Sequence, residues 1–441
     1  MFLARKLNPE GYGLLNATLA LASLFAVFAI NIGAHQVILR EISIRPRTTL
    51  GIFKIVFPVR MISLVIAILA LIFYEFYKGE SNYVLIGASI LIVTATLLWD
   101  LAESIAFGHL VTKITTIIGI TASLVWLIIV VLLPNHGLDV NLVIFLYACL
   151  FVLRGGVYLV LSYLKFVKGN KEPAKINLKA VLMMSMPFLL MRVVSALGEH
   201  VPILLLKGFS GAAEVGYYAV GNRFVMPIIM AITTGMKAVF PFMSRLYKEN
   251  IDEFNIKSVQ GFTFIFAFGS ITAATLTITS HIWLPLLFGD EYRQAARAFN
   301  YQAWIGVLLS FDLLLATMLT SSYRQNMLAF ITIIDVLILL PFLYVGSNYG
   351  ADGMAIAKLF GAILVFIFHV FFIIVKMQLN LRTKEFVSSV IFFIILMITS
   401  IFINDFLIKF SVLIVSLTIY LMVIKSYFID VFKAIIKIST K

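Results

Sequence analysis

The sequence predicts an all-α, polytopic membrane helix bundle of about thirteen transmembrane helices, on three observations. Hydrophobic residues make up 62% of the chain and charged residues only 12%, against roughly 45–50% and 25% in soluble domains. Apolar runs of about 17–25 residues, long enough to cross a bilayer as a helix, recur from one end to the other. Pro and Gly lie within these runs rather than in linkers, as membrane helices tolerate.

Each apolar run is bounded by a polar or turn cluster, and the boundaries define thirteen expected spans. In chain order they are residues 14–34, 52–74, 83–102, 114–133, 142–164, 180–206, 216–241, 258–284, 299–320, 328–346, 353–375, 386–403 and 406–424.

Lys and Arg are unevenly distributed over the segments between the spans. Of the 34 basic residues, 21 fall on one set of alternate connections and ends, and 7 on the other. Short cytoplasmic loops are enriched in Lys and Arg, so we expect a multi-pass protein of the cytoplasmic membrane with its carboxyl terminus in the cytoplasm. The net charge of +13 then reflects orientation, and we expect no nucleic-acid partner.

An odd number of spans places Met1 on the outer side, although nothing before residue 14 resembles a signal peptide. Two interpretations stay open. Either Met1 to Leu7 is the tail of a preceding helix that this sequence lacks, which would give fourteen in all, or the chain has thirteen helices.

An internal repeat relates the two halves of the sequence. A shift of 205 residues brings Gly11-Tyr12-Gly13 onto Gly216-Tyr217-Tyr218 and Arg40 onto Arg245. Six helices per copy predict two lobes of the same orientation, related by an axis along the membrane normal. We expect an N-terminal lobe over residues 1–170, a C-terminal lobe over 171–380, and two additional helices with a cytoplasmic tail over 381–441.

Short motifs in a fixed order make the chain resemble the polysaccharide and O-antigen flippases of the multidrug, oligosaccharidyl-lipid and polysaccharide exporter superfamily. These motifs are Ala4-Arg5-Lys6-Leu7-Asn8-Pro9-Glu10-Gly11-Tyr12-Gly13, Leu39-Arg40-Glu41-Ile42-Ser43, Val215-Gly216-Tyr217-Tyr218-Ala219, Phe240-Pro241, Ser244-Arg245-Leu246, Leu287-Phe288-Gly289-Asp290-Glu291-Tyr292 and Tyr349-Gly350-Ala351-Asp352-Gly353. The family has a first helix before the Ala-Arg-x-Leu segment, and this sequence lacks it.

The resemblance implies a transporter that moves a polyprenyl-pyrophosphate-linked oligosaccharide across the membrane by alternating access, for surface polysaccharide or lipopolysaccharide O-antigen assembly. The implied partners are this lipid-linked oligosaccharide, membrane lipids, a coupling proton or sodium ion, and polysaccharide polymerase or chain-length proteins. No cofactor is expected.

Four basic residues lie inside the expected spans, where charge is costly. They are the candidate pyrophosphate ligands: Arg154, Arg192, Arg223 and Lys358. Arg donates two hydrogen bonds from a planar fork to phosphate oxygens and stays charged in a dry site. We expect a cationic cavity between the lobes; the alternative is that each residue pairs with an acid on a neighbouring helix. Two more, Arg60 and Lys237, are near enough to the cytoplasmic face to extend their charges into water.

Deep acidic residues and histidines are candidates for coupling transport to a proton or cation: Glu199, His200, Asp312 and Asp335. The alternative for Glu199 is an ion pair with Arg192, and the two aspartates could be counter-ions of the cavity arginines. We expect His369 to be a hydrogen-bonded packing residue.

Two other function classes fit the sequence less well. An enzyme of the same pathway needs a sizeable outward loop with catalytic residues, whereas the longest here, around residues 285–298, is little over a dozen residues, and the chain lacks metal-binding His pairs and a Gly-rich phosphate loop. A cation-coupled multidrug exporter should present acids and aromatics to its substrate, whereas the interior charge here is mostly basic.

The single cysteine, Cys149, excludes an intramolecular disulfide.

Overall fold

The computed structural model describes the backbone of residues 1–31, 35–79, 82–134, 138–169, 172–174, 176–377, 381, 383–403 and 405–439. Side chains are described for these residues except 31, 187, 237, 238 and 423–439. Throughout this part of the chain the regular structure is helical.

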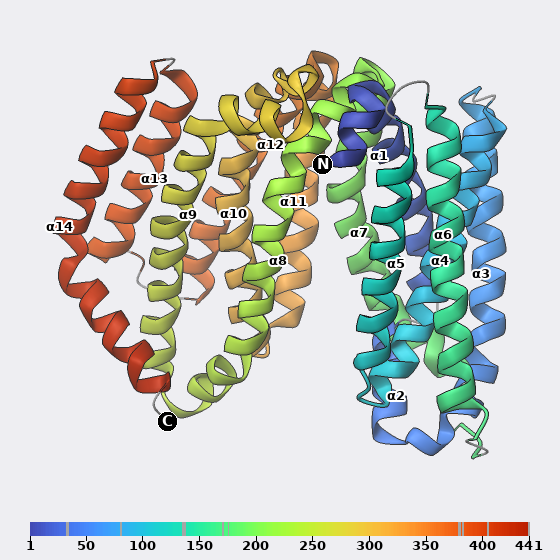
Figure 1. The fold of residues 1–441 in the computed structure, drawn as a ribbon. Coiled ribbons are helices and arrows are strands. Elements are labelled where there is room, and N and C mark those ends of the chain that lie inside the picture. The colour runs from blue at the N-terminus through green and yellow to red at the C-terminus, as the bar shows by residue number, and fades with distance from the viewer. Residues whose placement is uncertain are drawn as a thin grey trace. The chain divides into compact units, whose positions relative to one another are not determined.

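Within the described residues the chain has fourteen α-helices, and short 3₁₀- or π-helical turns lie between some of them (Figure 1). In order they are α1 (Phe2–Asn31), α2 (His35–Ile44), η1 (Pro46–Thr48), α3 (Thr49–Tyr77), α4 (Tyr83–Gly108), α5 (Lys113–Leu132), α6 (Val140–Ser162), η2 (Tyr163–Val167), α7 (Leu178–Ser210), α8 (Ala212–Glu249), α9 (Ile251–Phe288), η3 (Asp290–Tyr292), α10 (Ala295–Ser321), α11 (Gln325–Gly346), η4 (Ser347–Tyr349), α12 (Gly350–Phe372), η5 (Ile373–Met377), α13 (Lys384–Phe402) and α14 (Phe406–Ser439).

The long helices agree with the expected membrane spans. Within the described residues, eleven helical stretches are long and apolar enough to cross a bilayer, and one of these, Gln325–Met377, contains both α11 and α12. The apolar part of α14, Phe406–Met422, is shorter. The prediction of an all-α polytopic membrane bundle is confirmed.

Two local features were not expected from the sequence. Helix α1 is interrupted at Asn8, which has φ 58° and ψ 171°. A residue before proline avoids the α-helical region, and Asn tolerates a positive φ better than most residues. The short helix α2 is amphipathic and buries Val37, Ile38 and Ile42 against α4 and its neighbours.

The chain divides into two compact units, Met1–Gly216 and Tyr217–Lys441. Helix α7, which we expected in the second lobe, packs on α1 in the first unit. The expected lobe boundary at residue 170 follows from the internal repeat, whereas the two compact units are defined by packing. The boundary therefore stays a prediction.

Helices α4 and α6 form the most extensive helix pair of the first unit and run side by side with α3 and α5 (Figure 1). Gly155 of α6 permits the close approach, because a Cβ at this position would lie 2.9 Å from the Ala95 carbonyl oxygen of α4. Their core also contains Leu101 and Tyr158, both buried.

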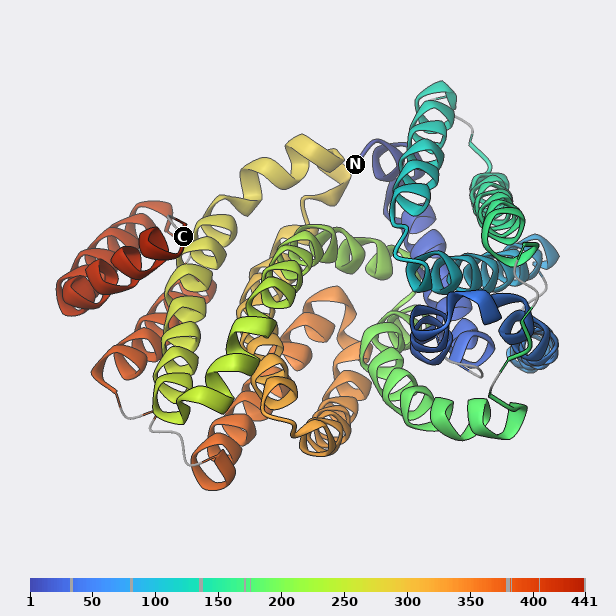
Figure 2. The ribbon, with the colours of Figure 1, turned by 90° about the horizontal axis from the view of Figure 1, so that it is seen from below.

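In the second unit α10 is the central helix and packs against α9, α11 and α12. Rings from several helices meet around Phe266, whose centroid lies 5.7 Å from that of Phe311 and 5.3 Å from that of Phe393. Helices α13 and α14 pack against α9 on the other side (Figure 2).

Candidate functional site

Asp100 of α4 is the centre of a charged cluster in the first unit. Arg60 of α3 donates a hydrogen bond from Nη1 to Asp100 Oδ2 at 2.7 Å, and His35 Nδ1 lies 3.1 Å from Asp100 Oδ1. The Arg60 side chain is fully buried. The expectation that Arg60 extends its charge into water is therefore wrong, because a carboxylate on the neighbouring helix compensates the charge inside the unit.

Arg154 of α6 lies between two aromatic rings. Its guanidinium carbon is 4.0 Å from the ring centroid of Trp99 on α4 and 4.3 Å from that of Phe151 one turn earlier on α6. Its Nε is buried and has no hydrogen-bond partner among the described residues. The cation is thus stabilised by ring faces, and no described carboxylate forms an ion pair with it.

The three candidates on α7 do not pair with one another. Arg192 and Glu199 are exposed within the chain and His200 is half-buried. In the part of α7 that the structure describes, no ion pair joins Arg192 to Glu199, so that alternative for Glu199 is wrong.

The two basic candidates of the second unit are on different helices. Arg223 is exposed on α8, and Lys358 is half-buried on α12. Lys358 has no acidic partner within 4 Å among the described side chains. Two of the four predicted phosphate ligands therefore belong to each unit, and their participation in one cavity stays a prediction.

Asp312 and Asp335, from two neighbouring helices, converge on His369. His369 Nδ1 lies 2.8 Å from Asp312 Oδ1, and His369 Nε2 lies 2.8 Å from Asp335 Oδ1. These residues come from α12, α10 and α11, three helices that pack on one another. We call the three residues the His369 cluster.

The cluster decides between the two roles left open for its aspartates. Their partner is a histidine, so the interpretation as counter-ions of arginines is wrong. His369 is buried and hydrogen-bonded as expected, with a side chain only 2% exposed, but it also connects both acids. The sequence did contain a signal for this cluster. Three consecutive expected spans each contain a deep ionisable residue, and such residues need partners.

The three side chains of the His369 cluster are arranged around hydrogen bonds. No group of three or more His, Cys, Asp or Glu side chains in the described ranges has an arrangement that could hold a metal ion. Both ring nitrogens of His369 are already at hydrogen-bond distance from carboxylates.

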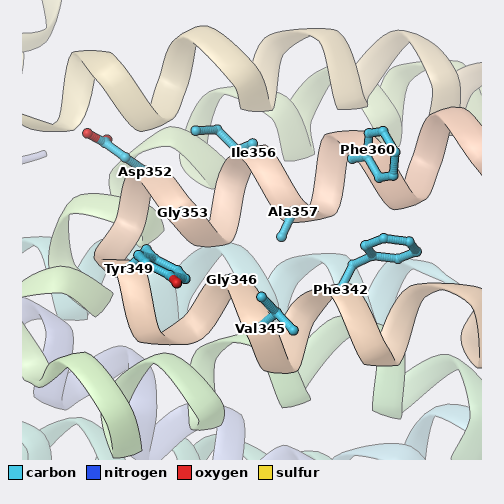
Figure 3. Close-up of a pocket in the computed structure, with 9 residues that line it drawn as sticks. All are labelled: Phe342, Val345, Gly346, Tyr349, Asp352, Gly353, Ile356, Ala357 and Phe360. Carbon is cyan, nitrogen blue, oxygen red and sulfur yellow. The ribbon is translucent and has the colours of Figure 1, made fainter.

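Among the described residues of the second unit, two open pockets contain no predicted phosphate ligand. The larger, about 510 Å³, is a groove between α11 and α12 (Figure 3), lined by Phe342, Val345, Gly346, Tyr349, Asp352, Gly353, Ile356, Ala357 and Phe360. Its walls are almost entirely apolar. The other, about 300 Å³, lies between α8 and α10 and is lined by Thr233, Met236, Phe240, Leu313, Ala316, Thr317 and Thr320.

Known protein families match the chain in two overlapping regions. Residues 1–247 match the model of a family described as polysaccharide biosynthesis protein, and residues 187–345 match the MatE model. None of the curated protein sequences compared with this chain gives a significant match.

Solved structures of transporters share the fold over nearly the whole chain. The lipid II flippase MurJ, in an inward closed conformation, has a TM-score of 0.66 at 14% identity, covering 97% of this chain and 96% of its own. A multidrug resistance MATE family transporter of the MOP superfamily, facing inward, has a TM-score of 0.64 at 15% identity, covering 90% of this chain and 93% of its own.

The first family model covers more than half of the chain, and the helical fold is shared with solved structures of transporters. The protein is accordingly a multi-pass membrane protein of the polysaccharide biosynthesis protein family, and its fold is shared with the solved MurJ flippase and MATE transporter structures.

Proposed function

We propose that the protein is a flippase that moves a polyprenyl-pyrophosphate-linked oligosaccharide across the cytoplasmic membrane for surface polysaccharide assembly. One observation carries the proposal. Asp100, Asp312 and Asp335 are engaged by Arg60, His35 and His369, whereas Arg154, Arg192 and Lys358 have no carboxylate within 4 Å among the described side chains. Basic side chains inside the spans that have no carboxylate at ion-pair distance favour an anionic ligand.

Arg154 is the strongest of the proposed phosphate ligands. Because Trp99 and Phe151 lie near its guanidinium, two apolar rings partly desolvate the group while adding no negative charge. Its N–H groups then suit an acceptor with several oxygens, and phosphate is such an acceptor. Arg192, Arg223 and Lys358 are the other proposed ligands of the pyrophosphate.

Two of the comparisons support a glycan as cargo. The family that covers residues 1–247 is described by polysaccharide biosynthesis, and one protein of the same fold is a flippase for lipid II. The uneven distribution of Lys and Arg supports a cytoplasmic carboxyl terminus.

A multidrug exporter is the second candidate, because residues 187–345 match the MatE model and MATE transporters share the fold. Cationic drugs would be disfavoured near the unpaired basic side chains, which is why we place this function second.

The test uses cells that lack the gene and are complemented with the wild type, Arg154→Ala or Lys358→Ala. We expect the deletion to abolish the surface glycan and to accumulate lipid-linked oligosaccharide that a lectin added outside spheroplasts cannot reach. The two variants should resemble the deletion at equal protein levels in the membrane.

Matched controls are Arg47→Ala in the first unit and Arg293→Ala in the second, since both side chains are exposed, at 84% and 73%. These should restore the glycan. An intact surface glycan in the deletion strain, with no accumulated intermediate, would overturn the proposal, and drug hypersensitivity in that strain would favour the exporter.

A further inference from the structure

The hydrogen bonds of His369 determine how many protons the His369 cluster holds. A neutral imidazole has one N–H donor and one acceptor nitrogen, and an ionised carboxylate only accepts. Yet both ring nitrogens lie 2.8 Å from carboxylate oxygens. With a neutral ring and two ionised aspartates, one of these contacts would bring two lone pairs together.

One additional proton makes both contacts hydrogen bonds. It can be on the ring, as an imidazolium between two carboxylates, or on one aspartate, whose O–H then donates to the ring. Both arrangements give the cluster a net charge of −1, whereas loss of the proton gives −2. The proton belongs to the cluster as a whole, since strongly interacting groups titrate together.

We propose that Asp312, His369 and Asp335 form a binding site for one exchangeable proton, and that its release separates one aspartate from His369 and loosens the packing of α10 or α11 on α12. The proton site stands on the geometry alone. The additional step, that this proton drives transport, rests on the proposed flippase function.

No other charged group in the described residues is placed to take over the role of this proton. Helix α12 packs against α10, α11 and the turns η4 and η5. On α10 and α11 the remaining titratable groups are nine or more residues from the aspartates: Arg297, Tyr301, Arg324 and Tyr344. On η4 the only one is Tyr349.

Along the α12 helix axis, Asp352 and Lys358 are seventeen and eleven residues before His369, and Lys376 on η5 is seven residues after it. At 1.5 Å per residue these positions are roughly 25 Å, 16 Å and 10 Å away. The aspartates are therefore the groups that set the charge around the ring.

Protons can reach the cluster through its carboxylates. The side chains of Asp312 and Asp335 are 29% and 25% exposed, whereas that of His369 is 2% exposed. Along α10, the pocket between α8 and α10 begins at Leu313, directly after Asp312, and continues to Thr320. Three threonines line it. Each donates its hydroxyl to a carbonyl oxygen of its own helix, so the hydroxyl oxygens can still accept hydrogen bonds from water.

The geometry favours a proton over a sodium ion. The Oδ1 atoms of both carboxylates are occupied by ring nitrogens, so a cation held by these two atoms would have to displace the imidazole ring. A proton needs no additional space.

The test measures hydrogen–deuterium exchange of α10, α11 and α12 against pH, with purified full-length protein in lipid nanodiscs. After correction for the chemical exchange rate, we expect wild-type amides near the cluster to exchange roughly tenfold faster once the proton is lost, as for a lost hydrogen bond to a charged group.

Asparagine substitutions give the decisive comparison. An Asn side chain resembles a protonated carboxyl, because it donates from nitrogen and carries no charge. Asp335→Asn and Asp312→Asn should therefore stay slow at every pH, and His369→Phe should be fast at every pH. His281→Gln and Asp290→Asn, away from the cluster, should keep the wild-type transition. A wild-type transition in both cluster Asn variants would overturn the proton site.

Transport is measured separately, as translocation of lipid-linked oligosaccharide in proteoliposomes with an imposed pH gradient. We expect the gradient to accelerate the wild type and to have no effect on Asp335→Asn. Equal acceleration of both would refute coupling through this site. Absence of any oligosaccharide translocation would instead refute the flippase function and leave the exchange result standing.

Discussion

Gly216 lies directly against Pro9 within the first unit: a Cβ built on Gly216 would be 2.0 Å from the Pro9 carbonyl oxygen. Gly13, one helical turn along from Pro9, is equally restricted, since its Cβ would lie 1.7 Å from the Ala212 carbonyl oxygen. Both glycines belong to the two motifs that the internal repeat aligns. The start of α8 can therefore cross α1 only where side chains are absent.

We predict that Gly216→Ala lowers the stability of the protein by roughly 1–3 kcal/mol or more, because the obstruction is backbone and no side-chain rotation relieves it. Thermal unfolding of the purified protein measures the effect. Gly235→Ala is the matched control, since it lies in the same helix and nothing lies within 4 Å of its Cβ position. Equal unfolding temperatures for the two variants would contradict the close crossing.

Arg60→Met should destabilise the first unit by about 3–5 kcal/mol, because it removes the main cation beside the partly buried carboxylate of Asp100. The measurement is the apparent unfolding temperature in the same lipid or detergent. Arg47→Met is the control, because Arg47 and Glu172 form an exposed pair with a nitrogen–oxygen distance of 3.9 Å, and such pairs contribute little. A small effect at Arg60 would show that His35 alone compensates Asp100.

Trp99→Leu should slow oligosaccharide translocation by about three- to thirtyfold, because a cation–π contact contributes roughly 0.5–2 kcal/mol to holding the guanidinium of Arg154. Trp99→Phe retains a ring and should retain most of the activity. Arg154→Lys should be impaired, because an ammonium cannot form the bidentate contact. The unfolding temperature is recorded for each variant, since Trp99 also packs on Tyr158 at 4.8 Å between centroids. Activity of Trp99→Leu equal to that of the wild type would argue against this role of the ring.

His109, at the C-terminal cap of α4 and outside the spans, should make the protein sensitive to acid. Burial beneath Phe166, whose ring centroid is 4.7 Å away, lowers the pKa of His109 below its usual 6.5. The folded state thus favours the neutral ring, and the stability that it contributes above pH 6.5 is lost as the pH falls through the lower folded pKa.

His109→Gln should therefore lose less stability than the wild type between pH 7 and pH 5, as measured by unfolding temperature at each pH. An identical decrease in both proteins would exclude His109 as a source of the acid sensitivity. Thr49 Oγ1 lies 2.9 Å from His109 Nε2. Thr49→Val removes this contact and provides a second check of the role of His109 in the acid sensitivity.

Local sequence was sufficient to predict the long helices. A helix in a bilayer satisfies its own backbone hydrogen bonds, so about twenty apolar residues specify a span without reference to the remainder of the chain. The expected spans therefore match the helices that begin at Thr49 and Tyr83, and those that follow. The break at Asn8 depends on a backbone dihedral angle, and the position of the amphipathic α2 depends on side-chain packing. A hydropathy pattern predicts neither.

The partners of the deep charged residues could not be predicted in the same way. Asp312, Asp335 and His369 were each recognisable as costly in a membrane, but 57 and 34 residues separate the aspartates from the histidine along the chain. Arg60 and Asp100 are 40 residues apart. Which acid meets which base depends on the rotation of each helix about its axis and on its neighbours.

The sequence by itself determined the membrane class, the positions of the spans, the bias of basic residues and the set of buried charges, because transfer from water to lipid acts on each segment separately. Only the tertiary structure decided that His369 joins two aspartates, that Arg60 is neutralised by Asp100, and that Arg154 lies between aromatic rings without a carboxylate partner. Charge pairing acts over a few ångströms between helices, and that distance exists only once the helices have packed.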